Sequence, residues 1–125
     1  MRKIFKTIIA AVLVSGIYIY TDAKDKNISV DFTLEELAFS INILDTIELK
    51  GEEVSPFMEI KNKFITIYKK NSTEKNKSAE INLTLPAAKN FLFFMQRARL
   101  KGADASFFNN ISNKMIEAIR KESKE

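Results

Sequence analysis

The chain has 125 residues, of which 46% are hydrophobic, with no cysteine, no histidine and a net charge of +4. This length suits one domain, and the missing residue types exclude disulfides, thiol nucleophiles and histidine-based sites. Three of the net positive charges lie in the first six residues. From Lys24 onward, 17 basic side chains face 15 acidic ones, too small an excess for nucleic-acid binding.

Residues 1–23 have the layout of a secretory signal. A basic start ending at Lys6 precedes the uncharged and mostly apolar residues 7–20, and small residues precede a cleavage point at Lys24. Three alternatives are open: a cleaved signal peptide, an uncleaved signal anchor in which Lys6 snorkels to the headgroups, and a soluble protein with a buried first helix. The first two predict export, with the domain periplasmic, extracellular or anchored outside the inner membrane.

A direct repeat with an offset of 51 residues organises the rest of the chain. When residues 33–70 are aligned without gaps to residues 84–121, 12 of 38 positions are identical. Unrelated segments share roughly two or three, so we interpret the match as a duplication. The tripeptide Leu49-Lys50-Gly51 returns as Leu100-Lys101-Gly102.

We expect an all-α domain in which two tandem helical hairpins, residues 30–70 and 81–121, pack as a four-helix arrangement. The polar residues 71–80 are expected to be the linker between them. The alternating residues 30–32 and 81–83 are either two short strands that pair about a pseudo-two-fold axis or extended lead-ins to helices.

The helices are predicted from caps and apolar stripes. Thr33 and Glu36 form a capping box, and Thr84 caps the first helix of the second repeat. Gly51 and Gly102 are expected to end the first helix of each hairpin, in a left-handed conformation. The predicted inward stripes comprise Leu34, Leu37, Ile41 and Leu44, then Phe57, Ile60, Phe64 and Ile67, then Ala88, Phe91, Leu92 and Met95, then Phe108, Ile111, Met115 and Ile119.

The two repeats carry opposite charge. Residues 30–70 have 5 basic and 8 acidic side chains, whereas residues 81–121 have 7 basic and 2 acidic ones. This asymmetry either holds one chain together or links neighbouring chains head to tail.

The run from Phe91 to Met95, followed by Arg97 and Arg99, is too apolar for one helix face. Either this helix is central, or part of it is exposed as an aromatic and arginine patch of the composition found in binding hot spots. The candidate partner-binding residues are Phe93, Phe94, Arg97, Arg99 and Phe107.

The carboxylates of Asp45, Glu48, Glu52 and Glu53 are the only dense cluster suited to acid-base chemistry or a hard cation. Their spacing fits a solvated helix end equally well. We therefore expect no enzyme, no cofactor, no metal site and no small-molecule substrate.

Phe32-Thr33-Leu34, the amphipathic stretch after it, Leu49-Lys50-Gly51 with the acidic pair behind it, and the second copy of this pattern form a recognisable arrangement. It resembles short helical-hairpin proteins encoded by bacteriophages and prophages, here in tandem duplicate. The resemblance implies a helical hairpin and a phage or mobile-element origin. It implies no site residues.

The sequence favours a non-enzymatic binding module, exported or membrane-tethered, that acts on a protein at the bacterial envelope. The alternative is a membrane-acting protein whose N-terminal segment inserts and oligomerises, with Ser15-Gly16 allowing close helix contact.

Overall fold

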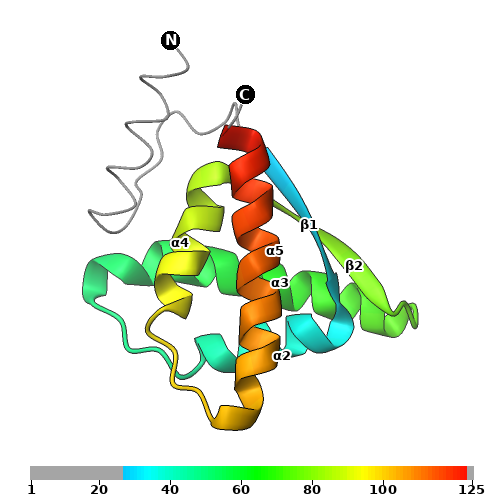
Figure 1. The fold of residues 1–125 in the computed structure, drawn as a ribbon, viewed down its shortest axis with the longest axis horizontal. Coiled ribbons are helices and arrows are strands. Elements are labelled where there is room, and N and C mark those ends of the chain that lie inside the picture. The colour runs from blue at the N-terminus through cyan, green and yellow to red at the C-terminus, as the bar shows by residue number, and fades with distance from the viewer. Residues whose placement is uncertain (1–26, 124–125) are drawn as a thin grey trace.

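The structure is a computed structural model that describes residues 27–123, and the expected signal or anchor at residues 1–23 lies outside this range. The described chain is mostly helical, with four helices and a two-stranded antiparallel sheet (Figure 1). Each repeat has the same order of strand, helix, 3₁₀ turn and helix. In chain order the elements are β1 (Asn27–Thr33), α2 (Leu34–Leu44), η2 (Gly51–Glu53), α3 (Val54–Thr73), β2 (Ser78–Thr84), α4 (Leu85–Met95), η3 (Gly102–Asp104) and α5 (Ala105–Ser123).

The two lead-in segments are paired strands, so the all-α expectation holds for the helices and the sheet is added to it. Each strand has seven residues, with alternate side chains buried. Val30 faces Ile81 in the ladder, and these two residues are equivalent in the 51-residue repeat. A two-fold rotation that exchanges the repeats therefore maps this pair onto itself, and its axis passes between the two residues.

The starts of α2 and α4 follow the expected capping chemistry. Thr33 Oγ1 accepts from Glu36 N at 3.0 Å, and Glu36 Oε1 accepts from Thr33 N at 2.9 Å. Thr84 Oγ1 accepts from Ala87 N at 3.2 Å, and Pro86 lies in the first turn of α4. Both caps satisfy amides that have no partner within their helix.

The expected left-handed helix end at Gly51 and Gly102 is wrong. Helices α2 and α4 end at Leu44 and Met95, and the glycines begin the 3₁₀ turns that follow. A Cβ at either glycine would meet nothing within 4 Å. The helices stop early because the next residues bond three positions back instead of four, as in Thr46 N to Ile43 O and Arg97 N to Phe94 O, both at 3.0 Å.

The Leu-Lys-Gly element instead starts the second helix of each repeat. Glu53 Oε1 accepts from Lys50 N at 2.9 Å, and Asp104 Oδ2 accepts from Lys101 N at 3.3 Å. The acidic residue three positions after the lysine thus closes the turn from which α3 or α5 begins.

The linker expected over residues 71–80 is shorter in the structure. Helix α3 continues to Thr73 and β2 begins at Ser78, so residues 74–77 make the connection. Lys75 has a φ of 62°, and Asn76 N donates to Asn71 O at 2.9 Å. The left-handed helix end that we expected at glycine therefore occurs at a lysine.

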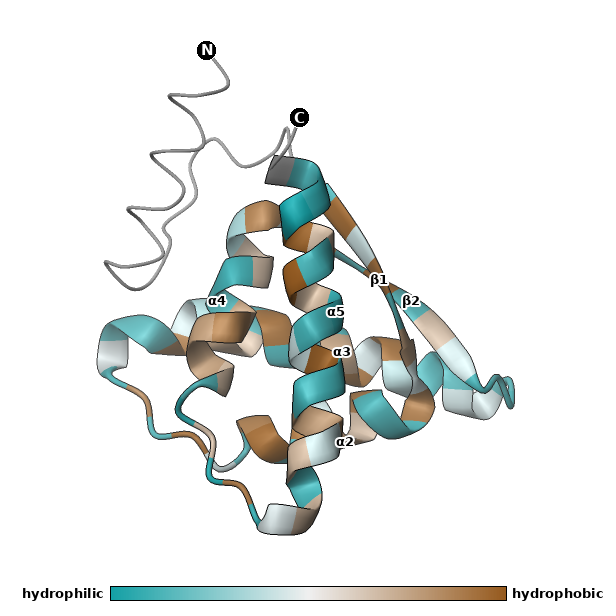
Figure 2. Cartoon of the chain, in the orientation of Figure 1, coloured by the Kyte–Doolittle hydropathy of each residue, from teal (hydrophilic) through white to brown (hydrophobic). Residues whose placement is uncertain are grey.

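The two repeats share one core of stacked aromatic rings. Phe64 stacks on Phe91 of the other repeat at 5.0 Å, and Phe57 meets Phe94 edge to face at 5.2 Å. Phe32 lies 6.1 Å from Phe64. Figure 2 shows α5 alternating between hydrophobic and hydrophilic segments along its length, as expected for a helix that covers a core with one face.

The predicted stripes are largely confirmed. Most of their members are buried, and the remainder are partly buried and packed against the same core: Leu34, Ile41, Ile67, Leu92 and Phe108. Helix α4 is buried on nearly all sides, from Leu85 to Phe91 and again at Phe94 and Met95. Of the two alternatives for the aromatic run, the central helix is the one that the structure shows.

Candidate functional site

The loops that follow α2 and α4 are tied together by Arg97. Its Nη1 donates to Glu53 Oε1 at 2.8 Å and to the carbonyl oxygen of Glu48 at 3.1 Å, and its Nη2 donates to Glu53 Oε2 at 2.5 Å. The pair is bidentate, the strongest arrangement for an arginine and a carboxylate. Arg97 therefore joins the second repeat to both the loop and the 3₁₀ turn of the first.

The electrostatics of this pair favour the ionised form of both groups. The hydrogen bonds from Arg97 lower the pKa of Glu53 from 4.5 to about 2, even though burial of the carboxylate acts in the opposite direction. The same hydrogen bonds raise the pKa of Arg97. The Glu53 side chain is only 6% exposed, so its charge depends on this partner.

A depression of about 250 Å³ lies beside this ion pair, lined by Thr46, Glu48, Arg97 and Arg99. We call it the arginine depression. Its four residues are two equivalent pairs of the repeat, Thr46 with Arg97 and Glu48 with Arg99. The depression therefore lies where the two repeats meet about their pseudo-two-fold axis, with residues of both loops around it.

Three of the predicted partner-binding residues have structural roles: Phe93 and Phe94 on α4, and Arg97 just after its end. Phe94 is completely buried against Phe57 and is not accessible to a partner. Arg97 is engaged by Glu53, and its guanidinium carbon lies 4.8 Å from the ring centre of Phe93. Phe93 is half-buried beneath this cation, so it contributes one edge to the surface.

Arg99 and Phe107 are the predicted residues that remain exposed. Arg99 makes no hydrogen bond or ion pair to any of residues 27–123. Phe107 is 37% exposed and stacks on Phe39 at 5.4 Å. Leu100, which the sequence analysis did not single out, is 39% exposed next to Arg99. The structure does not bring all five predicted residues into one open patch.

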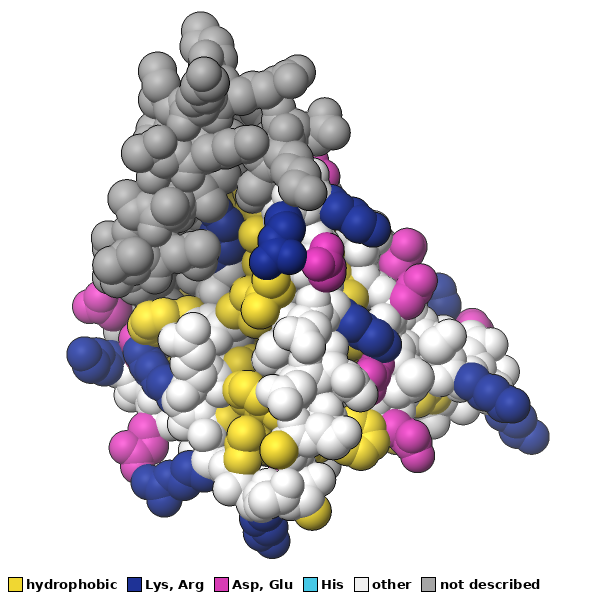
Figure 3. Space-filling model, viewed as in Figure 1, with side chains coloured by type: hydrophobic (Ala, Val, Ile, Leu, Met, Phe, Trp, Pro, Cys, Tyr) yellow, Lys and Arg dark blue, Asp and Glu magenta, His cyan; other side chains and the backbone are white. Residues whose placement is uncertain are grey.

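Figure 3 shows one face of the molecule with its side chains coloured by type. On the face shown, hydrophobic side chains form a strip over the region where α4 and α5 lie in Figure 1, with basic side chains beside it. Five large hydrophobic residues are more than a third exposed within the described range: Val54, Met58, Leu100, Phe107 and Ile116.

A second ion pair also joins the repeats. Lys114 Nζ donates to Glu36 Oε1 at 2.6 Å, and the ammonium lies 5.6 Å from the ring centre of Phe32. In both inter-repeat pairs the carboxylate comes from the acidic repeat and the cation from the basic one. The charge asymmetry therefore acts within a single chain.

The carboxylate cluster is dispersed. Glu53 is taken by Arg97, and Asp45 pairs with Lys61. Within residues 27–123 no three acidic side chains converge as metal ligands would. A further titratable group, Lys89, is buried on α4, and burial lowers its pKa to about 8.

The sequence analysis named Glu48 and Glu53 only as members of a carboxylate cluster, and it did not connect them with the arginines. A signal for the role of Glu53 in its turn was present, because Lys50 and Lys101 are each followed three residues later by an acid. Thr46 was missed altogether, since its place follows only from the early end of α2.

Comparisons with known proteins found no relative of this chain. No family model matches the chain, and no curated protein or solved structure matches it either. In the part of the chain that the structure describes, no helix has both the length and the apolar composition needed to cross a bilayer.

Proposed function

We propose that this protein is a non-enzymatic binding module that is exported, either released or tethered by its N-terminal segment, and that binds a protein at the bacterial envelope. The arginine depression and the exposed Leu100 beside it form the binding surface. A phage or mobile-element origin is part of the same proposal, because the repeat resembles phage-encoded hairpin proteins.

The observation that carries the proposal is the guanidinium of Arg99, which has no partner among residues 27–123. It lies at a depression of about 250 Å³ and is followed in the chain by Leu100, which is 39% exposed. Arginine and aromatic residues are enriched where protein interfaces have their largest energies, and a recess is where such anchors are desolvated. Arg97 supports the surface from below, because Glu53 holds it in place.

Site-specific photo-crosslinking in the bacterial host tests this surface. A photoreactive residue at Leu100 should give one discrete adduct, and Arg99→Glu should remove it because the charge that the partner meets is reversed. The same photoreactive residue at Lys69, which is exposed on α3, is the matched control and should give no adduct.

An adduct at both positions, or one at Leu100 that persists with Arg99→Glu, would contradict the binding surface. Unlabelled protein supplied in excess should compete the specific adduct away.

The intact mass of the protein from the fractionated host tests the export part. A mass that starts at Lys24 in the soluble exported fraction, or at Met1 in the membrane fraction, is the expected result. Recovery of the chain from Met1 in the cytoplasm would contradict export and leave the surface to be tested separately.

A further inference from the structure

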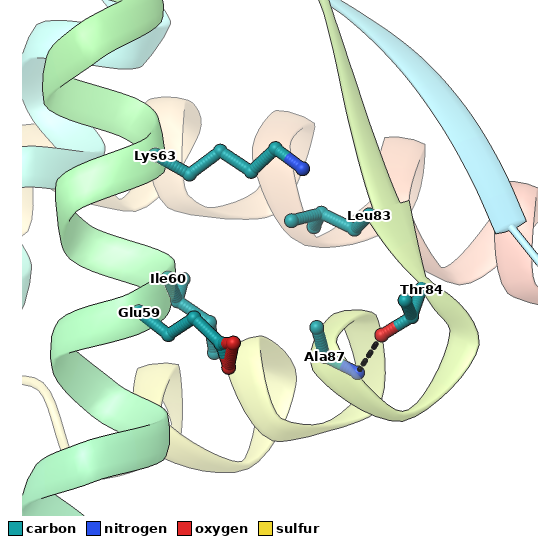
Figure 4. Close-up of a pocket in the computed structure, with 6 residues that line it drawn as sticks. All are labelled: Glu59, Ile60, Lys63, Leu83, Thr84 and Ala87. Atoms are coloured by element: carbon teal, nitrogen blue, oxygen red, sulfur yellow. Dashed lines mark hydrogen bonds between the residues drawn. The ribbon is translucent and has the colours of Figure 1, made fainter. Parts of the chain in front are cut away.

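A small cavity lies between α3 and the start of α4, away from the arginine depression. Its volume is about 80 Å³, and it is lined by Glu59, Ile60, Lys63, Leu83, Thr84 and Ala87. In Figure 4 the Lys63 side chain extends above Leu83, and the Thr84 hydroxyl caps the Ala87 amide at the bottom of the same space. The cavity has room for several waters or for a carboxylate group.

The other repeat has the equivalent place, and a carboxylate fills it. By the 51-residue offset, Lys63 corresponds to Lys114 and Ala87 to Glu36. Glu36 Oε1 accepts from Lys114 Nζ at 2.6 Å and from Thr33 N at 2.9 Å. The Glu36 side chain is 7% exposed, so this is a built carboxylate site inside the protein.

The cavity keeps the counterparts of the groups that hold Glu36, namely Lys63 and the Thr84 amide, but the position equivalent to Glu36 is Ala87. Ala87 has no side-chain oxygen that could accept a hydrogen bond from the Thr84 amide, as Glu36 accepts one from Thr33. Lys63 makes no hydrogen bond or ion pair with the described residues. Leu83 takes the place of Phe32 and fills less of the space.

The strand pairing directs the Thr84 amide away from β1. Leu34 N bonds to Lys77 O at 3.0 Å, so the neighbouring pair, Thr33 with Ser78, is a non-hydrogen-bonded pair of the ladder. Alternation along the ladder makes Asn27 with Thr84 a pair of the same kind. The N–H of Thr84 is therefore directed like that of Thr33, which binds the Glu36 carboxylate.

We propose that this cavity binds a carboxylate group from outside the chain, held by the Lys63 ammonium and the Thr84 amide at the start of α4. The bound group takes the place that the Glu36 side chain occupies in the other repeat. This site shares no residue with the arginine depression, so it goes beyond the proposed function and is tested without the envelope partner.

Glu59 also lines this cavity. It lies one helical turn before Lys63 on α3, and the equivalent residue of the other repeat is the neutral Asn110.

Two-dimensional amide NMR of the isotope-labelled full chain tests the proposal. N-acetylglutamate N-methylamide and propionate should give saturable shifts of the Thr84 and Ala87 amides, and N-acetylglutamine N-methylamide should give none. Tighter binding of the glutamate probe than of propionate would indicate an acidic side chain of a protein as the source. Equal binding would indicate a free carboxylate.

Variants of the lining residues make the test specific. Lys63→Gln should weaken binding by roughly tenfold, since it removes one charge-assisted hydrogen bond, whereas Lys69→Gln on the same helix should leave it unchanged. Ala87→Glu should abolish binding by filling the cavity from within, and if that variant does not fold, Lys63→Gln decides.

The proposal is overturned if the glutamine probe shifts the same amides as the glutamate probe. It is also overturned if Lys63→Gln binds the carboxylate as well as the unaltered chain does.

Discussion

The two repeats share their backbone but differ in the charges that they bring to their common interface. Glu53 of the first repeat meets Arg97 of the second through two hydrogen bonds. The reciprocal positions hold Asp104 and Thr46. Asp104 serves its own turn by accepting from the Lys101 amide, and Thr46 carries no charge.

The second ion pair shows the same asymmetry. Glu36 meets Lys114, whereas the reciprocal positions hold Ala87 and Lys63. The acidic repeat supplies both carboxylates and the basic repeat both cations, so two similar halves have become complementary rather than self-complementary. A duplicated fold can thus keep its backbone while the side chains that hold its halves together change.

Removal of Arg97 should give the largest effect. Arg97→Ala leaves the buried Glu53 carboxylate without its cation and should lower the free energy of unfolding by about 2–3 kcal/mol in urea denaturation. The equivalent change Thr46→Ala removes one hydroxyl bond to Ile43 O and should cost about 0.5–1 kcal/mol. Equal losses of stability at the two positions would contradict the different roles of Arg97 and Thr46 at the interface between the repeats.

Acid should weaken the interface through the same pair. The pKa of Glu53 falls from 4.5 to about 2 on folding, so its stabilisation is complete above pH 4.5 and is lost as the pH falls toward 2. With allowance for solvent around Arg97, the loss should be about 2 kcal/mol. Glu53→Gln should remove this pH dependence, and Asp104→Asn should retain it. Denaturation curves at pH 6, 4 and 2.5 measure it.

The lysines of the second pair should also differ. Lys114→Met breaks the bond to a Glu36 side chain that is 7% exposed and should cost about 1–2 kcal/mol. Lys63→Met, the equivalent change, should alter the free energy of unfolding by less than about 0.5 kcal/mol because no described group pairs with Lys63. A comparable loss from Lys63→Met would contradict the absence of a partner for Lys63 among residues 27–123.

The junction between the repeats holds a strained residue. Lys75 has a φ of 62°, which costs a residue with a Cβ about 1 kcal/mol relative to glycine. Lys75→Gly should therefore stabilise the protein by up to that amount in thermal unfolding. Lys77→Gly, at the other end of the connection, is the control and should give no gain.

The two glycines of the repeated tripeptide should give the smallest effects. Neither has a left-handed φ, and a Cβ at Gly51 or Gly102 meets nothing within 4 Å. Each change to alanine should stabilise the protein by about 0.5 kcal/mol by reducing the freedom of the unfolded chain. A loss of more than 1 kcal/mol at either position would contradict the open space around it.

The helices, their caps and most of the core follow from the sequence. Apolar spacing placed Phe57, Phe64 and Phe91 inward, and the Thr33 capping box marked where α2 begins. The ends of α2 and α4 did not follow, because the tight turns after Leu44 and Met95 have no residue with a special backbone preference. Glycine was the expected stop by local propensity, and tertiary contacts of the loops overrode it.

The candidate site was harder to predict than the fold. Composition drew attention to Arg97 and Phe94, yet it cannot tell an arginine that a buried glutamate engages from one that a partner engages. That distinction depends on Glu53, which is 44 residues away in sequence and reaches Arg97 only when the repeats pack. Arg99 and Leu100 follow Arg97 in the loop after α4, and Arg97 bonds this loop to Glu53 and Glu48 of the first repeat.

The pairing of Val30 with Ile81 has a kinetic consequence. Among residues 27–123, the first strand pairs with a strand that begins 51 residues further along the chain, so a long loop must close before any bond of this ladder is gained. A chain emerging from its N-terminus carries an open strand edge until the second repeat has been made. The first half of this protein is therefore synthesised first but cannot finish folding before the second.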